Sequence, residues 1–309
     1  MGEEETSFQE HINAITLELR KSNPSYSEVK NRMKRTLFKR VQIMDMPAAE
    51  VMEQFPFLGV PQLIVLDLEV MGEEETSFQE HINAITLELR KSNPSYSEVK
   101  NRMKRTLFKR VQIMDMPAAE VMEQFPFLGV PQLMLHEMTM RFGTDLAKNM
   151  ETSLNEMAPN IIRSAKEESQ KNLYANLIGP AEETTEGLVR NAALILLPAL
   201  FKENATFLYC VDSEPKGPTS TIVFNGSPDP LKAESVSIIM DNVTIIREAD
   251  IDMTQAVECL FAVYFLFSVQ YLVHIKHTMT FIQKYMLKLR QEHVKRTPIP
   301  VLKMYSQLL

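Results

Sequence analysis

Lysine and arginine residues are concentrated in one stretch of the chain, residues 28–44, which recurs unchanged as residues 98–114. Glu28 is the only acid in the first of these stretches. A helix of this sequence would place an apolar row on one side and cations on the other, where they could neutralise phosphate groups. The predicted polyanion contacts are Arg32, Arg35 and Lys39, with their copies Arg102, Arg105 and Lys109.

A solvated amphipathic helix is the alternative interpretation of the same stretch, because its cations can pair with nearby acids. A charge run without a recognised nucleic-acid-binding fold is weak evidence for phosphate binding. The predicted buried row contains Val29, Met33, Leu37, Val41 and Met44, and the same residues of the second copy. Lys30, Lys34 and Arg40 are expected at its edges.

Other chemistries lack the residues that they require. The chain has nine glycines and contains neither a phosphate-binding glycine loop nor a Gly-x-Ser-x-Gly nucleophile motif. His274 and His277 are three residues apart, and Cys259 lies earlier in the same apolar region. A structural zinc site, however, needs four converging ligands. We therefore predict no catalytic residue, no cofactor and no metal site, and expect that the protein is not an enzyme.

A tandem duplication dominates the organisation of the chain. Met1 to Leu63 recurs without change as Met71 to Leu133, and residues 64–70 separate the copies. Two copies fall short of a repeat array, so the first copy is expected to be dispensable for the fold. Only the second copy leads directly into the rest of the chain, so its Phe125, Phe127 and Leu128 are predicted to contact the C-terminal part, unlike Phe55, Phe57 and Leu58.

Apolar periodicity predicts helices through most of the first 200 residues. In each copy one helix precedes the basic stretch, over residues 8–20 in the first. Three further helices are expected over residues 132–150, 158–177 and 182–201.

The last third of the chain has a different pattern. Short β-branched runs predict strands at residues 206–211, 220–224, 236–240 and 243–246, and Asp241-Asn242 suits a tight hairpin. Residues 256–273 are nearly all apolar but too short to span a bilayer, so a buried helix packed on the sheet is expected. The predicted fold class is α+β, with a mostly helical N-terminal part, and a small antiparallel sheet and long buried helix in the C-terminal part. The predicted division is 1–70, 71–200 and 201–309.

Composition places the chain among ordinary globular proteins. Its net charge is −7, and two cysteines cannot form a disulfide framework. The acidic N-terminus lacks the apolar core of an export signal. A cytoplasmic or nuclear location without a membrane span is therefore expected.

Two groups of residues resemble one protein family. The first contains residues 33–38 and 55–58; the second contains residues 207–211, 262–267 and 280–285. Over about Phe78 to Tyr285 the chain resembles the fish proteins called sterile alpha motif domain-containing protein 3-like, although a sterile alpha motif itself is not apparent. The resemblance implies no catalytic residues.

The expected function is a non-enzymatic intracellular interaction or scaffold role with a protein partner. The alternative is a nucleic-acid-associated protein, of mobile-element origin, that uses the basic helix. Neither the identity of the partner nor the oligomeric state follows from the sequence.

Overall fold

The computed structural model describes residues 2–21, 25, 27–33, 76–113, 116–167, 185–248, 250–289 and 297–308. The chain forms two compact units, Met1–Leu87 and Glu88–Leu309. Phe55, Phe57 and Leu58 lie outside the described residues, as do Met44 and Met114. The division of the chain into three parts stays a prediction.

The first unit contains the helix α1 (Gly2–Leu19) and a helical turn at residues 27–33. Glu18 accepts a hydrogen bond from the Ser25 backbone amide (2.9 Å) and pairs with Lys21. The same contacts recur in the second copy, where Glu88 accepts from the Ser95 amide (2.8 Å) and pairs with Lys91. Identical local sequence therefore gives the same helix–turn–helix connection twice.

The N-terminal half of the second unit is helical. Residues 76–89 are helical in the second copy, and the boundary between the two units lies within this helix. The elements that follow it are α5 (Tyr96–Ile113), α6 (Ala118–Gln124), the 3-10 turn η2 (Pro126–Gly129), α7 (Pro131–Phe142), α8 (Leu146–Glu167) and α10 (Glu186–Leu200).

Gly143 separates two helices where the sequence predicted one over residues 132–150. Its backbone is left-handed, with φ 63°, and this conformation ends α7. Asp145 then caps α8 by accepting a hydrogen bond from the Lys148 amide at 3.1 Å. The predicted start of a helix at residue 158 is also wrong, because α8 continues through Pro159.

A four-stranded mixed sheet follows. Its strands are β1 (Tyr209–Val211), β2 (Thr221–Asn225), β3 (Ser235–Met240) and β4 (Val243–Glu248), in that spatial order. β2, β3 and β4 are antiparallel as predicted, but β1 runs parallel to β2. Because β1 has only three residues, the short segment 212–220 can bring the chain back to the end of the sheet where β1 began, and β2 then runs in the same direction. The turns η4 (Ala205–Phe207) and η5 (Pro230–Lys232) precede β1 and β3.

The predicted hairpin between β3 and β4 is confirmed. Asp241 and Asn242 both have positive φ, 51° and 61°, and Met240 pairs with Val243. Two positive φ values in a two-residue loop match the right-handed twist of the flanking strands.

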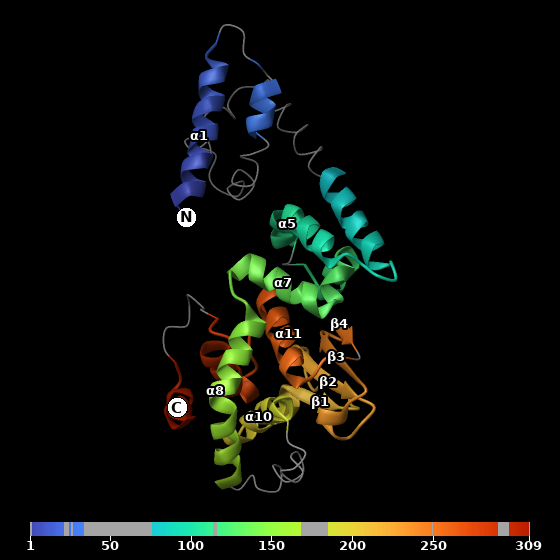
Figure 1. Cartoon of the computed structure of the whole chain (residues 1–309), viewed down its shortest axis with the longest axis vertical. Helices are drawn as coiled ribbons and strands as arrows, with labels where there is room; N and C mark the ends of the chain where they lie inside the picture. Colours follow the sequence, from blue (N-terminus) through green and yellow to red (C-terminus); the bar gives the residue numbers. More distant parts are fainter. Residues whose placement is uncertain are drawn as a thin grey trace. The chain divides into compact units, whose positions relative to one another are not determined.

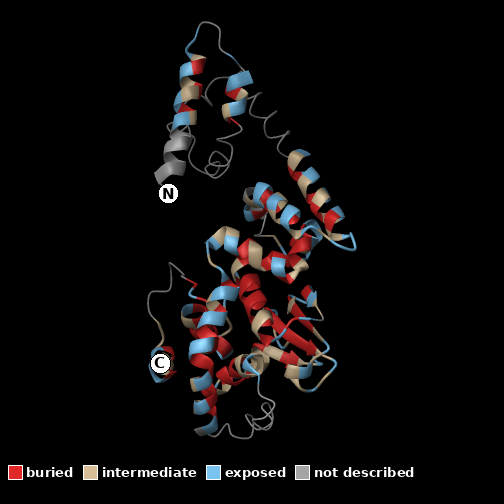
Figure 2. Ribbon diagram, viewed as in Figure 1, coloured by how far each residue is buried: buried red, intermediate tan, exposed pale blue. Residues whose placement is uncertain are grey.

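The buried helix α11 (Met253–Leu266) forms the centre of the second unit. It contacts β2 and β3 on one side and α7, α8 and α10 on others (Figure 1). Figure 2 shows it buried along nearly its whole length, which confirms the predicted packing of an apolar helix on the sheet. The helix ends before the predicted residue 273, because Ser268 is left-handed with φ 52°.

The remaining elements follow α11 in the chain, and some of them contact α8. They are the turn η6 (Val273–Ile275), α12 (Lys276–Phe281), the π-helical turn η7 (Ile282–Met286) and α13 (Ile299–Leu308). Asn160 of α8 donates to the Leu308 carbonyl at 2.7 Å, and Ser153 of α8 donates to the Met286 carbonyl at 3.0 Å. The Tyr285 ring stacks on Tyr305, with 3.8 Å between centroids.

Candidate functional site

Four buried side chains fix the orientation of the basic helix α5. Val99, Met103, Thr106 and Arg110 are each no more than 1% exposed. They recur at spacings of four, three and four residues, as one side of an α-helix does. The opposite side of α5 therefore faces solvent.

The predicted apolar row is wrong beyond Met103. Leu107 is half-buried and Val111 is 47% exposed, whereas Arg110, a predicted edge residue, is fully buried. The physical reason lies outside the basic stretch. Glu137 of α7 supplies a buried counter-charge for Arg110, so the helix turns its cation inward.

Each nitrogen of the Arg110 guanidinium donates a hydrogen bond. Its Nε donates to Glu137 Oε1 at 3.3 Å, and its Nη2 pairs with the other oxygen of the same carboxylate. Its Nη1 donates to the Met103 carbonyl at 2.9 Å and to the Thr106 hydroxyl. The Phe127 ring lies 5.6 Å from the guanidinium carbon. A bidentate pair with this many hydrogen bonds has a defined geometry, and it fixes α5 against α7.

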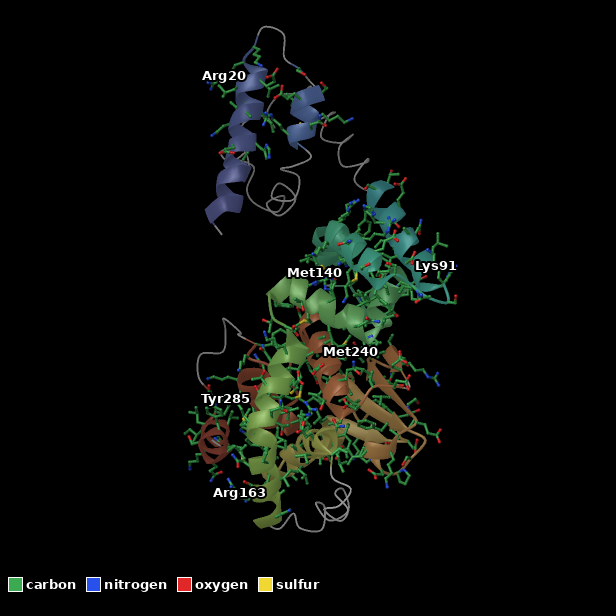
Figure 3. All side chains as sticks on the ribbon, viewed as in Figure 1. Arg20, Lys91, Met140, Arg163, Met240 and Tyr285 are labelled. Atoms are coloured by element: carbon green, nitrogen blue, oxygen red, sulfur yellow. The ribbon has the colours of Figure 1, made fainter. Side chains whose placement is uncertain are left out.

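Arg141 joins the same carboxylate from one turn further along α7. Its Nε donates to Glu137 Oε1 at 2.9 Å, and its side chain is 8% exposed. Burial lowers the pKa of Arg141, Glu137 opposes that change, and Arg110 adds to it. Figure 3 labels Met140, the preceding residue on α7. One glutamate thus serves two buried arginines, and we call these three residues the ionic lock.

The six predicted polyanion contacts have different surroundings. Arg102 is partly exposed and bonded to Glu98 at 2.7 Å, and Arg32 is bonded to Glu28 at 2.9 Å in the same way. Arg105 is exposed and Lys109 is half-buried. Arg35 and Lys39 lie outside the described residues. Arg102, Arg105 and Lys109 lie on one edge of α5.

A second group of cations lies on the other edge of α5, beside α7. Lys100 is half-buried and Lys104 is exposed, and His136 of α7 is close enough for both charges to act on it. Burial is the main cause that lowers the pKa of His136, followed by Lys100. The ring forms a hydrogen bond with the Lys100 backbone, whereas Nε2 is buried without a hydrogen-bond partner.

The sequence analysis did not predict His136, Glu137 or Arg141, because all three belong to α7 and lie outside the basic stretch. A signal existed in the sequence. Glu137 is the only acid in the mostly apolar helix α7, and a glutamate that is buried in a protein usually has a partner.

His274 and His277 do not converge on a metal position. His274 belongs to η6 and stacks on Phe207, with 4.9 Å between ring centroids. His277 belongs to α12, and its Nδ1 lies 2.9 Å from Glu203 Oε1. Glu203 also accepts hydrogen bonds from the backbone amides of His277 and Thr278, both at 2.8 Å, and so caps α12. Within the described part of the chain, no group of three potential ligands is placed to hold a metal ion.

Several loop acids also have structural roles. Asp212 accepts a hydrogen bond from the Gly226 amide at 2.8 Å, and Asp229 caps η5. Asp252 caps α11 by accepting from the Gln255 amide at 2.9 Å. Cys210 and Cys259 are both buried free thiols, and burial raises the pKa of each.

Glu258 of α11 is a buried acid without a close cation. It is 5% exposed, and burial raises its pKa to about 8. The negative charges of Asp252, Asp145 and Glu151 act in the same direction. Glu151 itself pairs with Arg190 at 3.5 Å.

The second copy contacts the sheet, as predicted. Phe125, Phe127 and Leu128 are buried, and η2 contacts β4. Gly129 lies so close to β4 that an added Cβ would be 3.1 Å from the Ile245 carbonyl oxygen.

Comparison with known proteins gives one distant similarity. The chain is 24% identical over 163 residues to sterile alpha motif domain-containing protein 3 of Mus musculus. The alignment covers 49% of this chain and 31% of the mouse protein, so the chain spans about a third of that relative's length. The resemblance seen in the sequence is confirmed at the level of a distant relationship.

No family model matches the chain, and no solved structure matches it. Among the described helices, none is both long and apolar enough to cross a membrane.

Proposed function

We propose that this chain is a non-catalytic interaction protein whose contact surface includes the outward side of α5. One observation carries the proposal: the ionic lock holds the inner side of α5 rigidly and leaves Lys104, Arg105 and Val111 exposed. A rigid helix binds a partner with little loss of conformational freedom.

The surroundings of the buried polar groups also support a non-catalytic role. Arg110, Glu137 and Glu203 each bond to other parts of the fold. General acid or base catalysis requires a group that can reach a substrate, and these side chains are occupied with positioning helices.

Capture from a native extract tests this proposal. The full chain is immobilised, and retained proteins are identified with and without nuclease treatment. The decisive variant is Lys104→Glu with Arg105→Glu, which reverses one charge on each edge of α5. Its matched control is the identical change in the first copy, Lys34→Glu with Arg35→Glu.

We expect a protein that is retained after nuclease treatment and lost with the second-copy variant, while the first-copy control retains it. Retention that is unaffected by the second-copy variant would contradict the assignment of α5. The absence of any retained protein would contradict an interaction role.

Nucleic-acid association is the second candidate, because Lys104 and Arg105 are exposed together on one helix. Counterion release predicts that binding to mixed DNA and RNA weakens steeply with salt. Arg102 and Lys109 support this role less, because Arg102 already binds Glu98 and Lys109 has other interactions. Binding that vanishes with nuclease, shows a steep salt dependence and is lost in the second-copy variant would favour this candidate.

A further inference from the structure

One edge of α5 carries a row of side chains that the fold leaves at the surface. The row contains Lys100, Lys104, Leu107 and Val111, and we call it the outer row. Its spacings of four, three and four residues match those of the buried row, displaced by one residue. The outer row therefore runs parallel to the buried row along about three turns of helix.

The outer row changes in character along the helix. Lys100 and Lys104 give its first half a positive charge, whereas Leu107 and Val111 make its second half aliphatic. Val111 is 47% exposed although the ionic lock holds Arg110 beside it completely buried. Single exposed aliphatic side chains are common, but this one continues an ordered row on a rigid helix.

His136 of α7 marks the inner edge of the charged half. Its ring is bonded to the backbone of Lys100, and its Nε2 is buried without a hydrogen-bond partner in the described structure. Because the charges of Lys100 and Lys104 both act on this ring, His136 senses a ligand that binds beside the two lysines.

We infer that the outer row, together with His136, binds an amphipathic helix of a partner protein. On that helix, carboxylates lie one turn away from aliphatic side chains. Charge complementarity places the carboxylates against Lys100 and Lys104, and the aliphatic side chains against Leu107 and Val111. Recognition of one helix by a row on another uses this spacing of anchors. The inference rests on the proposed interaction role and names its surface and its partner.

The composition of the row favours a protein over nucleic acid. Phosphate binding draws on cations and hydrogen-bond donors, and Leu107 and Val111 supply neither. Aliphatic side chains beside cations fit a protein interface that has an apolar centre and a polar rim.

Two charge-reversal variants of the full chain separate this row from general electrostatic attraction. Lys100→Glu with Lys104→Glu changes the outer row. Arg102→Glu with Lys109→Glu makes the same change in charge on the opposite edge of the same helix. Val111→Ser removes the exposed aliphatic side chain without a change in charge. Circular dichroism and the melting temperature show that each variant remains folded.

The probe is a fluorescent synthetic helical peptide with leucines four residues apart and glutamates one turn before them. A scrambled peptide of the same composition and a DNA duplex are the comparison ligands. We expect the outer-row variant to weaken peptide binding by about tenfold or more, because two attractive contacts become repulsive. We also expect Val111→Ser to weaken peptide binding severalfold. The opposite-edge variant should bind the peptide within about twofold of wild type. In NMR spectra, the His136 ring resonances should shift when the peptide is added.

Equal losses from the two charge variants, or equal binding of the scrambled peptide, would overturn the inference. So would the absence of peptide binding, or stronger binding of DNA that is insensitive to Val111→Ser. The two claims can fail separately. If a protein is captured from the extract but the outer-row variant binds the peptide as tightly as wild type does, the interaction role is supported and the assignment of the outer row is wrong. If capture from extract retains no protein at all, the interaction role itself fails.

Discussion

Glu258 shows how burial and neighbouring acids couple a carboxyl group to the stability of the fold. Its carboxyl group is buried on the central helix and feels the charges of other acids, so its folded pKa of about 8 is well above the ordinary value of 4.5. A raised acid pKa favours the protonated form in the folded state. The resulting contribution to stability is complete below pH 4.5 and is lost as the pH rises towards 8.

We predict that Glu258→Gln removes this dependence on pH. Each unit of pH between the two pKa values costs the wild type roughly 1.4 kcal/mol through this group. Urea unfolding at about pH 5 and about pH 7.5 should show that the variant gains stability relative to wild type at the higher pH. The exposed Glu214→Gln is the control and should follow the wild type. An unchanged pH profile in Glu258→Gln would show that Glu258 is ionised in the fold.

The packing of α5 on α7 depends on the unequal roles within the ionic lock. Glu137 neutralises two buried arginines, whereas Arg110 has one carboxylate partner and two neutral acceptors. Loss of the shared acid leaves two buried positive charges. Loss of Arg110 leaves Glu137 paired with Arg141.

Glu137→Leu is therefore predicted to cost more stability than Arg110→Met. We expect a loss of about 3–5 kcal/mol for the first, because it leaves buried charges without a partner. The second should cost about 1–3 kcal/mol through unsatisfied acceptors. Chemical denaturation measures both, and the exposed Arg105→Met is the control, expected within about 0.5 kcal/mol of wild type. The reverse order would mean that Arg141 does not share the carboxylate in solution.

The second unit contains a core of its own. The core around α11 is built within Glu88–Leu309, from α7, α8, α10 and the sheet. In the described second copy, η2 contributes to that core through β4. The first copy has the same sequence but precedes a different segment, residues 64–70.

Deletion of Met1 to Val70 is predicted to leave a folded protein. The melting temperature of the remaining chain should lie within about 3 °C of the full chain, because the core around α11 is retained. The chain has no tryptophan, so tyrosine fluorescence, to which the buried Tyr264 contributes, can follow unfolding in both proteins. Aggregation, or a decrease of about 10 °C or more, would show that the first copy supports the second unit.

Features encoded by adjacent residues were predictable from the sequence. The helix–turn–helix connection around Glu18 recurs around Glu88, because its hydrogen bonds join residues no more than seven positions apart. The Asp241-Asn242 hairpin and the Asp252 cap are local in the same way. The apolar composition of α11 predicted its burial, because such a helix has no polar side to expose.

Tertiary structure decided which side of α5 faces inward. Hydrophobic periodicity favoured Leu107 and Val111, but the observed row contains Thr106 and Arg110. The choice depends on Glu137, which lies 27 residues after Arg110 and outside the basic stretch. Burial of a cation becomes favourable only when a counter-charge is placed within hydrogen-bond distance, and no pattern confined to one helix can show that placement. The sequence therefore determined that α5 is an amphipathic basic helix, whereas the fold decided which of its cations remain at the surface.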